Sequence, residues 1–276
     1  MTPRAMLCPR CRRLIGSNEV TCSWCGASRA DAWYSRAWKT GALDGEWLVK
    51  AIITANVLFF VLSLLLSMEG RGSFRSPFSF LAPDRTSLLL LGASGTVPID
   101  RFGRFWTLLS ANYLHGGILH IFFNLMAVRQ IAPWVTREFG GSRMFIIYTL
   151  GGVGGFAVSY LAGIPFTVGA SAALCGLIGS LLYYGRNRGG VYGAAVYREV
   201  SGWVVGLILF GLLLPAINNW AHGGGILSGM LLARLLGYEE KGPENSAHRT
   251  IAFLCAVATL AVLGWAVVTA LLIWFR

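Results

Sequence analysis

The sequence predicts an all-α polytopic membrane protein, and two observations lead to this fold class. Of the 276 residues, 55% are hydrophobic and only 13% are charged, whereas about a quarter of the residues in soluble proteins are charged. The apolar residues also form long uncharged runs separated by short polar connections, and a helix needs about 20 apolar residues to cross a bilayer. We therefore expect most of the chain to lie in lipid.

Residues 1–30 contain two C-x2-C pairs, in the segments CPRC and CSWC. Four thiolates with this spacing suit the tetrahedral coordination of a structural zinc ion, and the predicted ligands are Cys8, Cys11, Cys22 and Cys25. Because so short a segment cannot bury a core, the metal would supply much of its folding energy. We predict a small zinc-ribbon-like module. The alternatives are a redox CxxC pair or a disulfide framework, and a cytoplasmic location disfavours persistent disulfides.

Residues 31–48 read as an aromatic and basic juxtamembrane linker. Trp and Tyr are enriched at the level of the lipid headgroups, and this linker carries Trp33, Tyr34, Trp38 and Trp47. The first long apolar stretch begins near Ala51, which is far beyond the usual reach of a signal sequence, so we expect no cleavable signal peptide.

Seven apolar stretches follow, and each is a predicted membrane span. Their approximate ranges are 49–67, 112–132, 143–163, 169–185, 200–217, 220–237 and 251–275. The connection from Met68 to about Phe105 is rich in Gly, Pro, Ser and Phe, and its apolar run is too short to cross. Irregular backbone is not stable in lipid, so we expect a short helical insertion in the membrane interface.

The positions of the basic residues predict the orientation. The formal net charge is +11, and under the positive-inside rule the N-terminus is cytoplasmic and the C-terminus lies outside. This orientation places these residues on the cytoplasmic side: Arg137, Arg143, Arg186, Arg188, Arg198, Arg234, Lys241 and Arg249. No basic stripe interleaved with aromatic residues follows the N-terminal segment, so we expect no nucleic-acid binding.

Three histidines lie within or at the edge of predicted spans: His115, His120 and His222. Ionisable groups at membrane depth are costly and normally face the bundle interior or a wet cavity. His120 and Asn124 are four residues apart on the second span, so their side chains share one helix face.

Two further spans begin with polar residues among small ones. Ser171 follows Gly169 at the start of the fourth span, and His222 opens the sixth, where positions 221, 225 and 229 are all small. Small residues one turn apart let helix backbones approach closely, which would bring Ser171 and His222 within hydrogen-bonding range if the two spans are neighbours.

This pattern suits nucleophilic catalysis. A serine hydroxyl becomes a good nucleophile when a base removes its proton, and neutral imidazole is suited to that task. No Asp or Glu lies in the second to sixth spans, so we expect a dyad of Ser171 and His222 rather than a triad. The backbone N–H of Ser171 with the side chains of His120 and Asn124 could stabilise the oxyanion.

Each residue also has a structural interpretation. Ser171 alone would usually be a packing residue, Asn124 alone an interhelical hydrogen-bonding residue, and His222 alone a structural residue or part of a proton relay. Only their combination favours an enzyme. The rival is a non-enzymatic polytopic protein, either a transporter or a membrane chaperone for client helices.

The combination resembles the rhomboid family of intramembrane serine proteases. The matching segments are LHGGILHIFFN (114–124), VGASAALCGLIG (168–179) and AHGGGILSG (221–229). The resemblance implies that Ser171 is the nucleophile and His222 the general base. It implies that the remaining motif positions support them: His120 and Asn124 as oxyanion donors, His115 as a structural neighbour, and Gly169 as the glycine leading into the nucleophile.

The resemblance covers roughly residues 49–237 and implies a six-helix core there, with residues 238–276 forming a loop and an additional C-terminal transmembrane helix. It implies no catalytic cofactor and transmembrane protein substrates cut near the membrane boundary. One departure from the family pattern is visible: Thr107 follows Trp106, whereas many members of the family carry a Trp-Arg pair at this place. We also expect a protein partner for the zinc-ribbon-like module and, from the short loops and the lack of a transit peptide, a bacterial inner membrane.

Overall fold

The computed structural model describes residues 5–7, 13–16, 19, 21–24, 26, 45–67, 81–214 and 217–274. In the N-terminal part, strands β1 (Ala5–Leu7) and β2 (Leu14–Gly16) pair antiparallel, with Met6 opposite Ile15. The long helices are α2 (Gly45–Leu65), α6 (Ile118–Phe139), α7 (Gly141–Leu161), α8 (Ser171–Arg188), α9 (Gly190–Leu213), α10 (Asn219–Leu236) and α11 (Ser246–Trp274).

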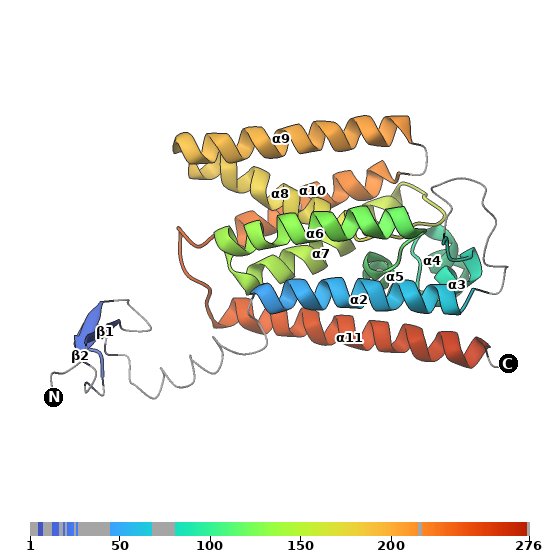
Figure 1. The fold of residues 1–276 in the computed structure, drawn as a ribbon, viewed down its shortest axis with the longest axis horizontal. Coiled ribbons are helices and arrows are strands. Elements are labelled where there is room, and N and C mark those ends of the chain that lie inside the picture. Colours follow the sequence, from blue (N-terminus) through green and yellow to red (C-terminus); the bar gives the residue numbers. More distant parts are fainter. Residues whose placement is uncertain are drawn as a thin grey trace.

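The long helices run side by side as one bundle, with α9 along one side and α11 along the opposite side (Figure 1). Of the described helices, five are long and apolar enough to cross a membrane, namely α2, α6, α7, α9 and α11. The other two, α8 and α10, are shorter and pack against α7 and each other. Every residue of α8 from Ala172 to Leu181 is buried, so α8 is the central helix. The predicted all-α polytopic membrane fold is confirmed.

Several predicted span boundaries need correction. The second span was expected to begin near residue 112, but α6 begins at Ile118 because residues 111–113 form a separate 3₁₀ turn, η2 (Ala111–Tyr113). The fifth span was expected to begin near residue 200, but α9 begins at Gly190. Hydropathy identifies the apolar part of a helix, whereas α9 extends beyond that part through Arg198 and Glu199.

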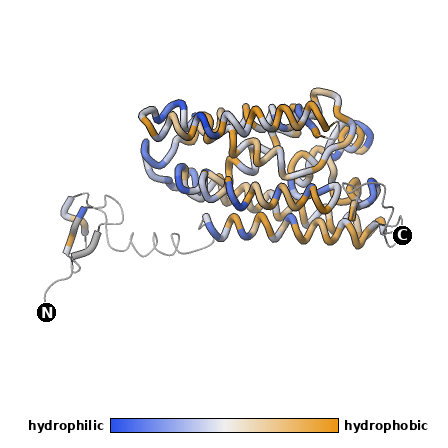
Figure 2. The backbone as a smooth tube through the Cα atoms, turned by 45° about the horizontal axis from the view of Figure 1, so that its top comes forward, coloured by the Kyte–Doolittle hydropathy of each residue, from blue (hydrophilic) through white to orange (hydrophobic). Residues whose placement is uncertain are grey.

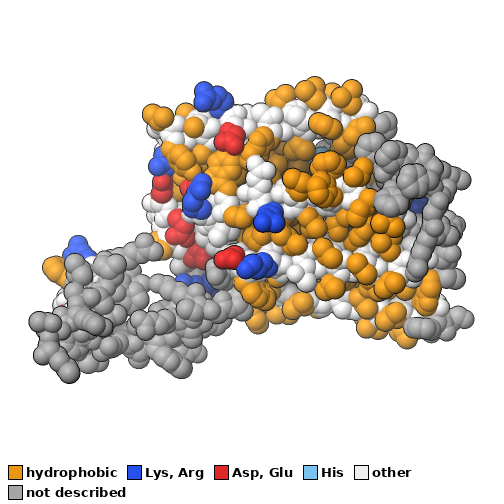
Figure 3. All heavy atoms as spheres, viewed as in Figure 1, with side chains coloured by type: hydrophobic (Ala, Val, Ile, Leu, Met, Phe, Trp, Pro, Cys, Tyr) orange, Lys and Arg blue, Asp and Glu red, His pale blue; other side chains and the backbone are white. Residues whose placement is uncertain are grey.

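The charged side chains of the bundle gather at one end. Figure 3 shows Lys, Arg, Asp and Glu side chains at the end where α6 meets α7, α8 meets α9 and α10 meets α11, and apolar side chains along the flank. Figure 2 shows the same division along the backbone, with hydrophilic helix ends and hydrophobic helix centres. This distribution is the one expected of helices that cross a hydrocarbon layer.

At the charged end, one arginine fastens the connection that leads into α11. The Arg143 side chain is only 4% exposed and lies 3.4 Å from a Glu239 carboxylate oxygen. Its guanidinium donates hydrogen bonds to three carbonyl oxygens, those of Phe139, Gly242 and Pro243. The α6–α7 turn is therefore bonded to the connection between α10 and α11, and α11 packs along α7.

At the opposite end, the connection after α2 folds into short helices, in agreement with the expected helical insertion. These are α3 (Arg85–Leu90), α4 (Thr96–Phe102) and α5 (Thr107–Ser110), and η2 follows them. The Thr107 hydroxyl donates to the nearby Arg104 carbonyl at 2.7 Å and also lies 3.4 Å from Ser94 Oγ, so it contacts the segment before α4. The Arg104 guanidinium donates to the Leu89 carbonyl at 3.1 Å and ties the segment before α5 to α3.

Candidate active site

Ser171 and His222 lie together at the end of the bundle opposite the charged end. Ser171 is the first residue of α8, and His222 lies in the first turn of α10. Ser171 Oγ and His222 Nε2 are 2.9 Å apart, within hydrogen-bonding distance. Both residues are half-buried, so the pair is accessible from outside the protein and the surrounding helices also exclude much of the solvent.

Glycines make this approach possible, because α10 lies too close to its neighbours for side chains at the contact. A Cβ atom at Gly229 would lie 2.7 Å from Gly176 Cα of α8, and one at Gly155 of α7 would lie 2.6 Å from the Ala221 carbonyl oxygen. Real Cβ atoms do not come so close to backbone atoms, so the three helices can pack in this way only with glycine at these positions.

The surroundings of His222 leave it with Ser171 as its hydrogen-bonding partner. His222 Nδ1 is buried and has no partner among the described residues. A neutral imidazole has one N–H donor and one acceptor nitrogen. If Nε2 accepts the Ser171 hydroxyl proton, Nδ1 carries the hydrogen, and no described carboxylate receives it. The arrangement is chemically a Ser-His pair without a third member.

His120 is held so that one of its ring nitrogens is a donor. The backbone N–H of Gly116 donates to His120 Nδ1 at 3.3 Å. Since Nδ1 accepts, the hydrogen of a neutral ring resides on Nε2. Nε2 in turn lies against the backbone of Gly169, two residues before Ser171. His120 therefore presents an N–H group next to the start of α8.

The backbone conformation and the close neighbours at position 169 allow only glycine. Its φ angle is +136°, a conformation that L side chains rarely adopt. A Cβ atom there would lie 2.8 Å from His120 Nε2 and 3.5 Å from Ser171 Oγ. The Gly169 N–H donates to the Ala111 carbonyl at 2.9 Å, which fixes the segment against η2.

Two further residues of the matching segments, Asn124 of α6 and His115 just before α6, make different contacts. The Asn124 amide donates to the His120 carbonyl of its own helix at 2.8 Å, so in this structure it supports the position of His120. His115 is fully buried, and neither of its ring nitrogens has a partner among the described residues. Its ring meets that of His120 edge to face, with the centroids 5.1 Å apart.

Asn218 lies outside the matching segments, and the structure gives it a specific position between two helices of the site. Asn218 is the N-cap of α10, and its Oδ1 accepts from the Ala221 N–H at 3.0 Å. Its amide donates to Ser159 Oγ at 2.6 Å and to Thr167 Oγ1 at 3.0 Å. One side chain thus joins the helix of His222 to the segment that leads into Ser171.

The predicted zinc ligands cannot be placed as a set. Cys8, Cys11 and Cys25 lie outside the described residues, whereas Cys22 is described and is buried. In the part of the chain that the structure describes, no group of three or more His, Cys, Asp or Glu side chains could hold a metal ion. The zinc site therefore stays a prediction from the cysteine spacing.

Comparison with known proteins identifies relatives of this chain. The family described as "Rhomboid domain" matches residues 103–239. RHOMBOID-like protein 5 of Arabidopsis thaliana is 30% identical over 257 residues, which cover 79% of this chain and 81% of that protein. RHOMBOID-like protein 4 of the same plant is 30% identical over 227 residues, or 74% of this chain and 58% of that protein.

A bacterial protein is also similar. Rhomboid protease GluP of Bacillus subtilis is 29% identical over 156 residues, which are 56% of this chain but only 31% of that protein. The chain thus spans 58% of the length of RHOMBOID-like protein 4 and 31% of the length of GluP. One further plant relative, at 27% identity, is named Inactive RHOMBOID-like protein 8, so similarity over these helices does not by itself establish activity.

Proposed function

Because this chain belongs to the rhomboid family, we propose that it is an intramembrane serine endopeptidase that cleaves transmembrane proteins with a Ser171–His222 dyad. The observation that carries the proposal is the 2.9 Å separation of Ser171 Oγ and His222 Nε2. A relative named as inactive is 27% identical over 200 residues, and the presence of both side chains at this distance favours activity here.

In the first step, His222 Nε2 takes the proton of the Ser171 hydroxyl while Oγ attacks the carbonyl carbon of the scissile peptide. The tetrahedral intermediate then collapses, and the imidazolium gives its proton to the leaving amine. A water molecule, deprotonated in turn by His222, attacks the acyl-enzyme ester and frees Ser171. Neutral imidazole acts as the base, and the imidazolium that it becomes acts as the acid. Neither step requires a third residue, as in other dyad variants.

The negative charge of the intermediate needs fixed donors. Ser171 is the first residue of α8, so its backbone N–H has no acceptor within the helix. His120 Nε2–H lies beside Gly169 and is the second donor in this proposal. One N–H of the Asn124 amide donates to the His120 backbone carbonyl and supports the position of His120. The second N–H of this amide is the third oxyanion donor in this proposal.

A transmembrane helix must unwind before it can be cut, because its peptide groups are hydrogen-bonded within the helix. We expect Gly, Pro or polar residues near the cut to favour hydrolysis for this reason. Replacing them by leucine in a single-span substrate should slow cleavage, and an unchanged cleavage rate would contradict this part of the proposal.

For the orientation, we propose that the charged end of the bundle faces the cytoplasm. The last turns of α6 and α8 at that end carry Arg137, Arg186 and Arg188, as the positive-inside rule requires. The dyad would then lie near the opposite membrane surface. The relatives include plant and bacterial proteins, so they lend no support to the expectation of a bacterial membrane.

The function is tested by reconstituting the full chain in lipid vesicles with a single-span reporter protein. We expect cleavage by the parent and none by Ser171→Ala or His222→Ala. Ser228→Ala is the matched control, because Ser228 lies on α10 and packs against Gly154 of α7. A parent without activity toward several reporters would favour the rival transporter or membrane chaperone.

For the N-terminal segment, we propose that Cys8, Cys11, Cys22 and Cys25 bind one structural zinc ion, with support from their spacing alone. The module would then serve as a binding site for a protein partner. Elemental analysis of the purified chain should find about one zinc per chain, and Cys8→Ser with Cys11→Ser should remove it. A parent chain without zinc would refute this proposal and leave the proposed protease unaffected.

A further inference from the structure

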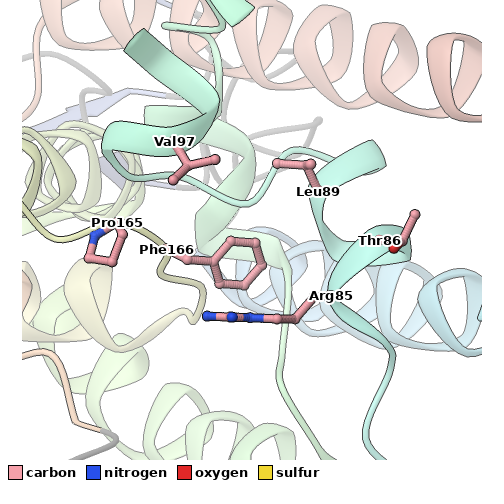
Figure 4. Close-up of a pocket in the computed structure, with 6 residues that line it drawn as sticks. All are labelled: Arg85, Thr86, Leu89, Val97, Pro165 and Phe166. Carbon is pink, nitrogen blue, oxygen red and sulfur yellow. The ribbon is translucent and has the colours of Figure 1, made fainter. Parts of the chain in front are cut away.

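A pocket of about 320 Å³ lies at the same end of the bundle as Ser171, between the short helices and the segment that leads into α8. Its lining comes from three places in the chain: α3, the start of α4 and the α7–α8 connection. The lining residues are Arg85, Thr86, Leu89, Val97, Pro165 and Phe166 (Figure 4). No residue of the candidate active site lines it, so the pocket is a separate feature.

The pocket combines apolar walls with one cation. The Arg85 guanidinium carbon lies 5.2 Å from the centroid of the Phe166 ring, and Figure 4 shows the two groups next to each other. Arg85 is exposed and forms no ion pair with any described carboxylate. Thr86 supplies the other polar side chain of the lining. An occupant therefore meets a positive charge at one wall and hydrocarbon at the others.

The acidic groups nearest in the chain are bonded elsewhere. Asp84 caps α3 by accepting from the Ser87 N–H at 2.6 Å. Asp100 accepts from the Tyr160 hydroxyl at 2.9 Å. Among the described carboxylates, none therefore forms an ion pair with the Arg85 guanidinium.

The surroundings of the pocket have the composition of a membrane interface. Three large apolar side chains between residues 81 and 105, around α3 and α4, are exposed: Leu81 at 44%, Phe102 at 54% and Phe105 at 61%. Arg101 is exposed beside them. Exposed aromatic and basic side chains at the end of a transmembrane bundle are typical of contact with lipid headgroups.

We propose that this pocket binds an anionic phospholipid. The phosphate would lie at Arg85, and the first carbons of an acyl chain would lie against Leu89, Val97 and Phe166. Guanidinium groups bind phosphate through parallel hydrogen bonds, and the neighbouring Phe166 ring restricts the position of the Arg85 guanidinium. A zwitterionic headgroup would bring a second cation toward Arg85, so an anionic lipid is preferred.

Lipid in this pocket would contact the backbone that precedes the nucleophile. The Val97 N–H donates to the Pro165 carbonyl at 3.2 Å, and Ser94 exchanges two hydrogen bonds with Thr167, at 3.0 and 2.8 Å. The pocket walls are thus bonded to the segment that continues to Ser171. The inference itself concerns binding and does not depend on the proposed proteolysis.

The proposed binding of an anionic phospholipid is tested by native mass spectrometry of the purified full chain. Phosphatidylglycerol and phosphatidylcholine with identical acyl chains are the probes. We expect the parent to bind the first phosphatidylglycerol about fivefold more tightly, which is the effect of roughly one basic residue near an anionic lipid. Arg85→Gln should abolish this preference, and Leu89→Trp should reduce it by filling the pocket. The matched control is Arg101→Gln, because Arg101 lies nearby and does not line the pocket.

Equal binding of the two lipids by the parent would overturn the proposal, as would an Arg85→Gln variant that keeps the preference. An equal loss in Arg101→Gln would also overturn it, since the preference would then come from diffuse positive charge. If the lipid preference stays unchanged in all variants while Leu89→Trp alters which position of a reporter helix is cut, the pocket holds a substrate side chain and the lipid proposal is wrong. Should Leu89→Trp fail to fold, the exposed Arg85 decides the question alone.

Discussion

The side-chain amide of Asn218 donates a hydrogen bond to Thr167 Oγ1 at 3.0 Å. This contact links two parts of the chain that each carry one member of the dyad. Asn218 caps the helix of His222, four residues before it, and Thr167 precedes Ser171 by the same number of residues. The relative position of Ser171 and His222, the proposed catalytic groups, is therefore supported by a hydrogen bond that neither of them makes.

Asn218→Ala should lower kcat about tenfold and leave KM nearly unchanged. The variant loses the cap of α10 and both donor contacts. A cap alone contributes about 1 kcal/mol, which is about a fivefold change in rate when it falls on the reactive geometry, and the lost donor contacts add to it. Steady-state cleavage of a reporter in vesicles measures both constants.

The control for this prediction is Asn187→Ala, which removes an exposed amide whose bond to the Tyr183 carbonyl lies at the far end of α8. It should keep the parental kcat. A parental kcat in Asn218→Ala would show that this contact does not position the dyad.

Gly169→Ala should reduce kcat at least about a hundredfold. The new Cβ atom would lie 2.8 Å from His120 Nε2, so the ring must move, and loss of one oxyanion donor costs a factor of about 100 to 1,000. Gly163→Ala is a close control, because Gly163 also has a positive φ, +80°, and a Cβ atom added there would meet no atom within 4 Å. The control should lose some stability and keep its kcat within a few fold. Similar losses of kcat in the two variants would point to backbone strain instead of displacement of His120.

Arg143→Met should destabilise the protein by about 2 kcal/mol and loosen the connection before α11. The guanidinium is buried and bonded to three carbonyls and Glu239, and removing it leaves these acceptors without their donor. Unfolding in mixed detergent micelles measures stability, and limited proteolysis of residues 238–245 reports the loosening. Arg137→Met, whose side chain is 66% exposed, should change neither. Equal protease sensitivity of both variants would exclude an anchoring role for Arg143.

The sequence predicted the features that depend on composition and spacing. Apolar runs indicated the helices, and the small residues around Ser171 and His222 indicated that two helices could approach closely. The start of α6 at Ile118 was missed because the polar and aromatic residues of η2 are as compatible with a helix as with a 3₁₀ turn. The position of Asn218 could not be predicted, since its partners Ser159 and Thr167 are more than 50 residues away in the chain.

The Arg85 pocket was missed for the same reason. Its walls come from three segments that meet only after folding, and a single arginine in a loop carries no signal of its own. The oxyanion role of Asn124 was expected from its spacing to His120, and the structure gives its amide a bond within its own helix. Spacing along a helix predicts which face a side chain occupies but not which of several acceptors it chooses.

The most direct measurement of the central claim is the mass of the protein after reaction with a fluorophosphonate, which modifies an activated serine. In lipid vesicles the parent should gain one phosphonyl group, located at Ser171 by peptide mapping, and both Ser171→Ala and His222→Ala should gain none. A parent that stays unmodified, or a Ser171→Ala variant that is still modified at the parental rate, would contradict the account.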